Sequence, residues 1–217
     1  LLSLLIYFRT GLLKLVRPFL DDCYHCKVKT PESRLIINLL MATGPAVVLG
    51  LLLEKKIETV FRDPLLIAGA LLIGSVIFYL AERLSKVRVN LETLGLRQSL
   101  SLGLFQAFAL IPGISRSGIT ISGGLLSGLS RAESGYFVFL LSIPIIFGAG
   151  LKSLFDAFKD GVLFHSGSTF IVGFAASAIT GYFVVKYFLA FLRHNSLTVF
   201  IWYRIFLALL VIFFVVR

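Results

Sequence analysis

A helix break and a cluster of hydrogen-bond donors stand side by side in one apolar part of the chain. Pro112 lacks a backbone N–H group and restricts Ile111 before it, and Gly113 permits backbone conformations that a side chain forbids. Such a break frees backbone N–H groups, and the first turn of the following helix aims them at one spot with its positive dipole end. The pattern predicts an anion-binding site.

The side chains after the break have the chemistry of a phosphate site. Arg116 carries a planar positive fork that suits phosphate oxygens, and Ser115, Ser117 and Thr120 carry hydroxyl donors. The alternative is an ordinary loop between two helices that contains an arginine. Because an arginine within a membrane segment is costly and commonly marks function or a paired charge, the residues favour the phosphate site.

The composition predicts an all-α polytopic membrane protein. The chain has 217 residues, of which 58% are hydrophobic and 15% are charged, and its mean hydropathy is +0.95. Soluble proteins are about a quarter charged. We expect one integral membrane domain over residues 1–217. The net charge of +10 indicates short basic loops that touch membrane lipids, and no aromatic and basic patch supports nucleic-acid binding.

About five to six transmembrane helices and one re-entrant helix hairpin are expected. The expected helices cover 1–16, 35–53, 64–80, 132–151, 169–192 and 197–216, with polar loops at 17–34, 54–62, 81–97 and 152–167. The hairpin covers about 98–129, in halves of 98–111 and 115–129. Each half is too short to cross a bilayer alone, so we expect the tip to lie within the membrane.

The hairpin sequence resembles the second signature of the undecaprenyl-pyrophosphate phosphatases, the bacitracin-resistance family. The resemblance rests on Pro112–Thr120, on its continuation to Gly124 and on Gly128–Arg131. Further matches lie at Gly44–Gly50, Phe139–Pro144 and Tyr203–Arg204, so the resemblance runs in order along nearly the whole chain. It implies a multi-pass protein of the plasma membrane that removes the terminal phosphate of undecaprenyl pyrophosphate, recycles the lipid carrier for cell-wall synthesis and confers bacitracin resistance.

The resemblance assigns the hairpin tip to the polyprenyl pyrophosphate substrate. The expected pyrophosphate-binding residues are Gln106, Gly113, Ser115, Arg116, Ser117, Gly118 and Thr120, and the expected catalytic residues are Ser115, Arg116 and Ser117. We expect Arg116 to stabilise the charge of the transition state. One of the serines could be a nucleophile, but it would need a base, and no histidine or acid lies near the hairpin in sequence.

The sequence also departs from the family pattern. The first family signature, a glutamate-rich stretch followed by Pro-Val-Ser-Ser-Thr-Gly-His, has no counterpart here, so we expect an N-terminally incomplete chain and half of an inverted-repeat architecture. The family implies a divalent cation (Mg or Ca) held by that signature, and no metal ligand is identifiable in this chain. Tyr136 stands where the family has a glutamate. Glu133 is expected to be a helix N-terminal charge and not a base.

Several alternatives stay open at this point. A broken helix that aims its N-terminus at an anion also suits a transporter or flippase for a polyprenyl-phosphate-like anionic lipid. A non-catalytic relative that binds polyprenyl phosphate is the third hypothesis, and a homodimer is left open. Basic loops place 17–34 and 83–97 in the cytoplasm, whereas the resemblance implies a site that opens outward. Trp202, Tyr203 and Arg204 are expected to form an interfacial anchor.

Overall fold

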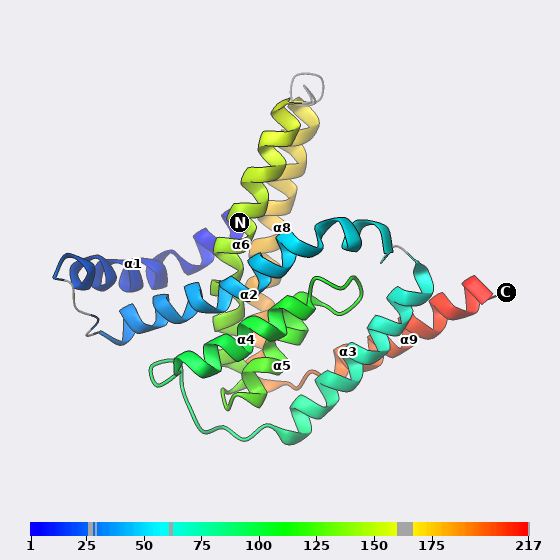
Figure 1. Cartoon of the computed structure of the whole chain (residues 1–217), viewed down its shortest axis with the longest axis horizontal. Coiled ribbons are helices and arrows are strands. Elements are labelled where there is room, and N and C mark those ends of the chain that lie inside the picture. The colour runs from blue at the N-terminus through cyan, green and yellow to red at the C-terminus, as the bar shows by residue number, and fades with distance from the viewer. Residues whose placement is uncertain (26–27, 29, 61–62, 160–166, 217) are drawn as a thin grey trace.

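Eight helices make up the described part of the fold (Figure 1). The computed structural model describes residues 1–25, 28, 30–60, 63–159 and 167–216. The helices are α1 (Leu2–Tyr24), α2 (Pro31–Val60), α3 (Pro64–Leu84), α4 (Leu96–Phe108), α5 (Arg116–Leu126), α6 (Arg131–Lys159), α8 (Gly167–His194) and α9 (Thr198–Val216). All regular secondary structure in these ranges is helical, which confirms the predicted all-α class.

Five of the described helices are long and apolar enough to cross a membrane. The candidate spans are Pro31–Leu53, Pro64–Leu84, Arg131–Lys159, Ser168–His194 and Thr198–Val216. The hydrocarbon core of a bilayer is about 30 Å thick and requires about 20 apolar residues in a helix. The protein is therefore a multi-pass membrane protein, in agreement with the predicted number of spans.

Some polar stretches that we predicted as loops belong to helices. The observed ends are Tyr24 for α1, Val60 for α2 and Lys159 for α6, against predicted ends at Val16, Leu53 and Leu151. Charged residues that follow an apolar run can lie beyond the membrane without ending the helix, so hydropathy underestimates helix length. Residues 160–166 of the predicted loop 152–167 lie outside the described residues.

Hydrogen bonds define the starts of two helices, α3 and α2. Asp63 caps α3, because its Oδ1 accepts from the N–H of Leu65 at 2.7 Å. Before α2, the Thr30 Oγ1 accepts from the N–H of Ser33 at 3.2 Å. The N–H and Oγ1 of Thr30 both donate to Asp22 Oδ2 at 3.0 Å. This second set of bonds ties the end of α1 to the start of α2.

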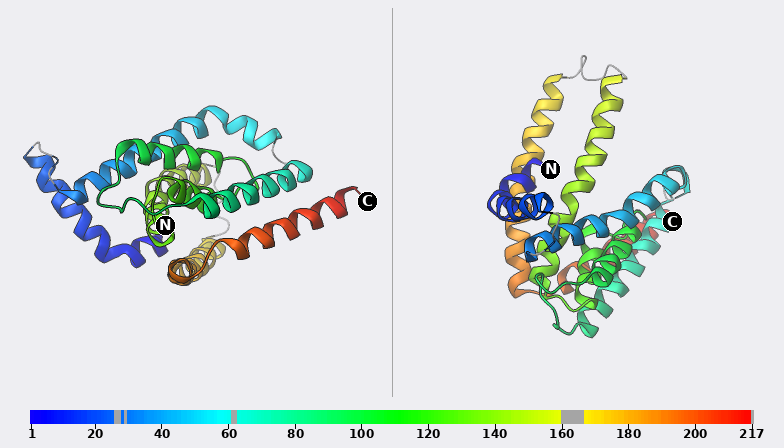
Figure 2. Two further views of the ribbon diagram at one scale, coloured as in Figure 1. Left: turned by 90° about the horizontal axis from the view of Figure 1, so that it is seen from below. Right: turned by 60° about the vertical axis from the view of Figure 1, so that its left-hand side comes forward.

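The α4–α5 hairpin lies at the centre of the helix contacts. Through α4 it contacts α2, and through α5 it contacts α3 and α6. Helices α3 and α9 run side by side, and the pair α6 and α8 projects away from the other helices (Figures 1 and 2). The helices that surround the hairpin therefore determine where its tip is held.

Small residues let the hairpin approach its neighbours closely. A Cβ added to Gly103 of α4 would stand 2.9 Å from the Cα of Ala42 on α2, and one added to Gly123 would stand 2.7 Å from the ring of Phe105. Gly118 and Gly124 of α5 make similarly close contacts, with Phe78 of α3 and Ser134 of α6. Small residues of the hairpin therefore serve close helix packing.

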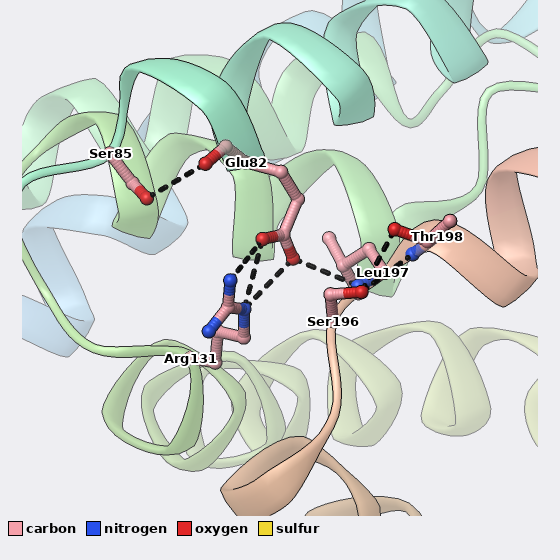
Figure 3. A network of polar contacts seen from close by, with 6 residues as sticks. All are labelled: Glu82, Ser85, Arg131, Ser196, Leu197 and Thr198. Carbon is pink, nitrogen blue, oxygen red and sulfur yellow. Dashed lines mark hydrogen bonds and ion pairs between the residues drawn. The ribbon is translucent and has the colours of Figure 1, made fainter.

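A buried carboxylate joins three helices at the end of the fold nearest the α8–α9 turn (Figure 3). Glu82, near the end of α3, accepts hydrogen bonds from the guanidinium of Arg131 at the start of α6, with Nε to oxygen distances of 3.0 and 2.9 Å. Its Oε1 also accepts from the N–H of Leu197, just before α9, at 2.8 Å. The Glu82 side chain is only 9% exposed, whereas that of Arg131 is 42% exposed. Glu82 therefore fixes the relative positions of α3, α6 and α9.

We expect Glu82→Ala to destabilise the protein. Removing one partner of a largely buried ion pair leaves the other unpaired, and because Arg131 is partly exposed we expect a loss of about 2 kcal/mol. For a chain of this size this corresponds to a fall of about 4–8 °C in the melting temperature, measured in detergent. Glu92→Ala, at an exposed position, is the control. An equal fall for both variants would contradict the role of Glu82.

Candidate anion-binding site at the hairpin tip

The turn between α4 and α5 has an unusual backbone conformation. Gly113 has a φ of 96° and Ser115 has a φ of 74°, and Ser115 is the only described residue other than glycine with a positive φ. A side-chain residue held in this region costs of order 1–3 kcal/mol, and such residues cluster at functional sites. The positive φ of Ser115 immediately precedes Arg116, the first residue of α5.

Backbone donors at the start of α5 have no protein acceptor. The N–H of Ile119 donates to the carbonyl of Ser115 at 3.0 Å, which is the first bond of the helix. Within the described residues, the N–H groups of Arg116, Ser117 and Gly118 have no acceptor. Unpaired N–H groups in the first turn of a helix form a ready site for an anion, and the helix dipole adds to the attraction.

Side-chain donors at the tip are also without partners. Arg116 and Ser117 are half-buried and Ser115 is exposed. None of these three side chains has a hydrogen bond or an ion pair with another described residue. The tip therefore presents a guanidinium, two hydroxyls and three N–H groups, with no carboxylate among them. This is the donor set that the predicted anion site requires, and the binding of an anion there stays a prediction.

Thr120 and Gly118 lie deeper than the rest of the predicted set. Thr120 is fully buried, and its Oγ1 donates to the carbonyl of Arg116 at 2.8 Å. Its hydroxyl hydrogen is therefore engaged within α5, which differs from the expected donation to a ligand. Gly118 packs against the ring of Phe78, and a Cβ there would collide with that ring. Both residues hold the first turn of α5 in place.

Gln106 contributes a buried amide with no partner. It is 2% exposed, and neither its Oε1 nor its Nε2 makes a hydrogen bond to any described residue. Burying an unpaired amide costs about 1–3 kcal/mol, so such groups are rare in native structures. Stability does not account for a glutamine here, which is consistent with its predicted place in the site.

Arg204 is a residue of this region that we wrongly placed at the membrane interface. Trp202 and Tyr203 are exposed, as an anchor requires, but Arg204 is only 5% exposed. Its Nη2 donates to the carbonyl of Gly113 at 2.9 Å and to that of Leu71 at 3.1 Å. Neighbouring residues of a helix face different directions, so Arg204 faces α3 while the aromatic residues face outward. A lone arginine in an apolar span was the signal that could have identified it.

Glu133 and Tyr136 both lie outside the tip. The Ser130 Oγ accepts from the N–H of Glu133 at 3.2 Å, and Glu133 Oε2 accepts from the N–H of Ser130 at 3.3 Å, which is a capping box at the start of α6. This confirms Glu133 as a helix N-terminal charge. Tyr136 packs on Phe8 of α1, with ring centroids 5.2 Å apart, and lines a pocket between α1, α6 and α8.

The residues at the tip do not fit a divalent cation. Magnesium and calcium require oxygen ligands, chiefly carboxylates. The described residues contain no group of three or more histidine, cysteine, aspartate or glutamate side chains that could hold a metal ion. The divalent cation that the resemblance implies therefore stays a prediction.

The fold defines a multi-pass membrane protein, and the tip of its helix hairpin gathers the donors that a phosphate-type anion site requires. Comparison with known proteins identifies the family. The sequence matches the family described as bacitracin resistance protein BacA over residues 1–210, and the chain belongs to this family.

Several relatives carry the name undecaprenyl-diphosphatase. The one from Rubrobacter xylanophilus is 37% identical over 212 residues, which cover 97% of this chain and 78% of the relative. The one from Pelotomaculum thermopropionicum is 42% identical over 183 residues, or 84% of this chain and 68% of the relative. A third, from Moorella thermoacetica, is 37% identical over 212 residues, or 98% and 78% of the two chains.

We expect Gln106→Leu to leave the melting temperature unchanged or to raise it. The substitution replaces a buried, unpaired amide with an apolar group of similar size. Gln98→Leu is the matched control on the same helix, because the Gln98 amide accepts from the N–H of Gly95 at 2.7 Å and donates to the carbonyl of Ser127 at 3.3 Å. Gln98→Leu should lower the melting temperature in detergent. A fall of several degrees for Gln106→Leu would show that its amide is paired.

Proposed function

We propose that this chain is an undecaprenyl-diphosphatase, a membrane hydrolase that removes the terminal phosphate of undecaprenyl pyrophosphate. Membership of the bacitracin resistance family and the name shared by the relatives support this assignment. The structural observation that carries it is the tip of the α4–α5 hairpin, where a guanidinium, two hydroxyls and three backbone N–H groups lie without an acceptor among the described residues. The product, undecaprenyl phosphate, returns to the cell wall pathway as its lipid carrier, and its recycling confers bacitracin resistance.

The substrate has two parts that match two parts of the protein. Its pyrophosphate is strongly anionic and suits the donors of Ser115, Arg116, Ser117 and the first turn of α5. Its polyprenyl chain is apolar and stays in the lipid around the membrane-spanning helices. At a helix break within the membrane, the pyrophosphate of the substrate can reach the donors while its polyprenyl chain stays in the lipid.

Arg116 has the central role in the proposed chemistry. The reaction breaks the bond between the terminal phosphorus and the bridging oxygen, and a new bond joins that phosphorus to an oxygen nucleophile. The charge of the transition state spreads over the equatorial oxygens, where a planar guanidinium and fixed N–H groups stabilise it. Ser115 and Ser117 add hydroxyl donors beside Arg116. The role of one of these serines as the nucleophile stays a prediction. The leaving group is the lipid monophosphate.

We further propose that the hairpin enters the plasma membrane without crossing it. Helix α4 has 13 residues and α5 has 11, so each reaches no more than about 20 Å at 1.5 Å per residue. A bilayer core is about 30 Å thick. The buried faces of both helices and their contacts with α2, α3 and α6 suit a hairpin enclosed by protein.

A transporter or flippase for an anionic lipid was the alternative that the sequence left open. The relatives described above are named as diphosphatases, and they give the alternative no support. The helix break is common to both functions, so it does not discriminate between them. Release of inorganic phosphate does.

Arg116→Ala should lower phosphate release from undecaprenyl pyrophosphate by about 100- to 1,000-fold, because it removes a donor aimed at developing charge. Arg116→Lys should retain part of the activity, since it keeps the charge but loses the bidentate fork. The assay measures kcat/KM in detergent by colorimetric detection of phosphate.

The matched control is Arg97→Ala. Arg97 is exposed in the first turn of α4, at the opposite end of that helix from the tip. Its substitution should leave kcat/KM within about twofold. Equal losses for Arg97→Ala and Arg116→Ala, or wild-type activity in Arg116→Ala, would contradict the proposed site.

A further inference from the structure

We propose that Arg204 is a positioning residue for the phosphatase reaction: it holds the Gly113 turn against α3 and so sets the geometry of the donors that follow. This inference rests on the proposed function, and it assigns to α9 a part in the active site that the motif at the tip does not reveal. All hydrogen bonds of the Arg204 side chain go to protein atoms, so its proposed role is to position other groups and not to bind the substrate.

The guanidinium of Arg204 links three segments of the chain. Its Nη2 donates to the carbonyl of Gly113 at 2.9 Å and to the carbonyls of Leu71 and Ala70 at 3.1 and 3.4 Å. Its Nε donates to the Ser75 Oγ at 3.3 Å. One side chain of α9 therefore bonds both α3 and the turn before α5.

Stability alone does not account for this arginine. Arg204 is 5% exposed, and within the described residues it has no acidic partner, because all of its acceptors are carbonyl or hydroxyl oxygens. A buried cation that is paired only with neutral groups is costly, because no opposite charge offsets its desolvation. What an apolar side chain cannot supply is the bond to the Gly113 carbonyl.

Phe78 extends the same contact to the other side of the tip. The guanidinium of Arg204 lies over the Phe78 ring, 4.8 Å from its centroid. That ring packs so closely on Gly118 that a Cβ on this glycine would collide with it. Arg204 thus contacts the chain on both sides of Ser115–Ser117: it bonds Gly113, two residues before this stretch, and it reaches Gly118, directly after it, through Phe78. A movement of the guanidinium would displace both ends of the donor cluster.

Gly74 of α3 provides the space that the guanidinium occupies. A Cβ added at Gly74 would collide with the Nη2 of Arg204 and would stand 3.0 Å from the carbonyl oxygen of Ile114. Gly69, on the same helix, has no atom within 4 Å of an added Cβ. The two glycines form a matched pair, since alanine at one displaces Arg204 and alanine at the other leaves it in place.

The test compares Gly74→Ala, Gly69→Ala, Arg204→Lys and Arg204→Met with the wild type. Phosphate release is measured well below the melting temperature of each variant and normalised to the monodisperse, folded fraction. We expect kcat to fall by at least tenfold in Gly74→Ala and in both Arg204 variants, with wild-type kcat in Gly69→Ala. Arg204→Met should lose activity even if its melting temperature is unchanged or raised. A residue that only stabilises the fold would lower the melting temperature and leave kcat of the folded fraction intact, and that result would overturn the proposal.

A second measurement separates this inference from the proposed function. Inorganic pyrophosphate should raise the melting temperature of the wild type and of Gly69→Ala, and this shift should be lost in Gly74→Ala and Arg204→Met. If the wild type released no phosphate but the shift followed this pattern, the proposed function would fail, and only the positioning of the anion-binding donors by Arg204 would stand. If the wild type were active and the variants kept both kcat and the shift, the positioning role would fail alone. Absence of the shift in an inactive wild type would overturn both.

Discussion

The unpaired N–H groups at the start of α5 are the constraint on which the rest of the structure depends. Backbone donors cannot be left without partners in a hydrocarbon environment, so a helix break at membrane depth is tolerated only where protein or a polar ligand surrounds it. Here the N–H groups of Arg116, Ser117 and Gly118 are gathered with a guanidinium and two hydroxyls. An anionic headgroup satisfies all of them at once. The same break that makes the hairpin unfavourable as a plain membrane helix supplies the donors of the proposed phosphate site.

The surrounding helices hold the break in one geometry. Close packing at Gly103, Gly118 and Gly123 leaves the two arms of the hairpin little room to move. Behind the tip, Arg204 connects α9 with α3 and with the turn itself. At the end of the fold nearest the α8–α9 turn, Glu82 joins α3, α6 and α9. Helices α3 and α9 therefore contribute to the candidate site by position, although they lie far from the tip in the sequence.

The local features could be predicted from the sequence, and the distant contacts could not. Pro112, Gly113 and the polar residues that follow them indicated both the break and its chemistry, because each acts on its own stretch of backbone. Asp63 indicated a helix start for the same reason. The bond from Arg204 to Gly113 joins residues 91 positions apart, and that between Glu82 and Arg131 joins residues 49 apart. Hydropathy treats these charges as loop or interface residues, since it carries no information about which helices become neighbours.

The most direct test of the central claim follows the substrate itself. Wild-type protein in liposomes is mixed with undecaprenyl pyrophosphate, and the phosphorus species are followed by ³¹P NMR. The account predicts that the two signals of the lipid pyrophosphate give way to equal amounts of inorganic phosphate and lipid monophosphate. Lipid pyrophosphate that stays intact while it moves between the leaflets, or release of inorganic pyrophosphate in place of phosphate, would contradict it.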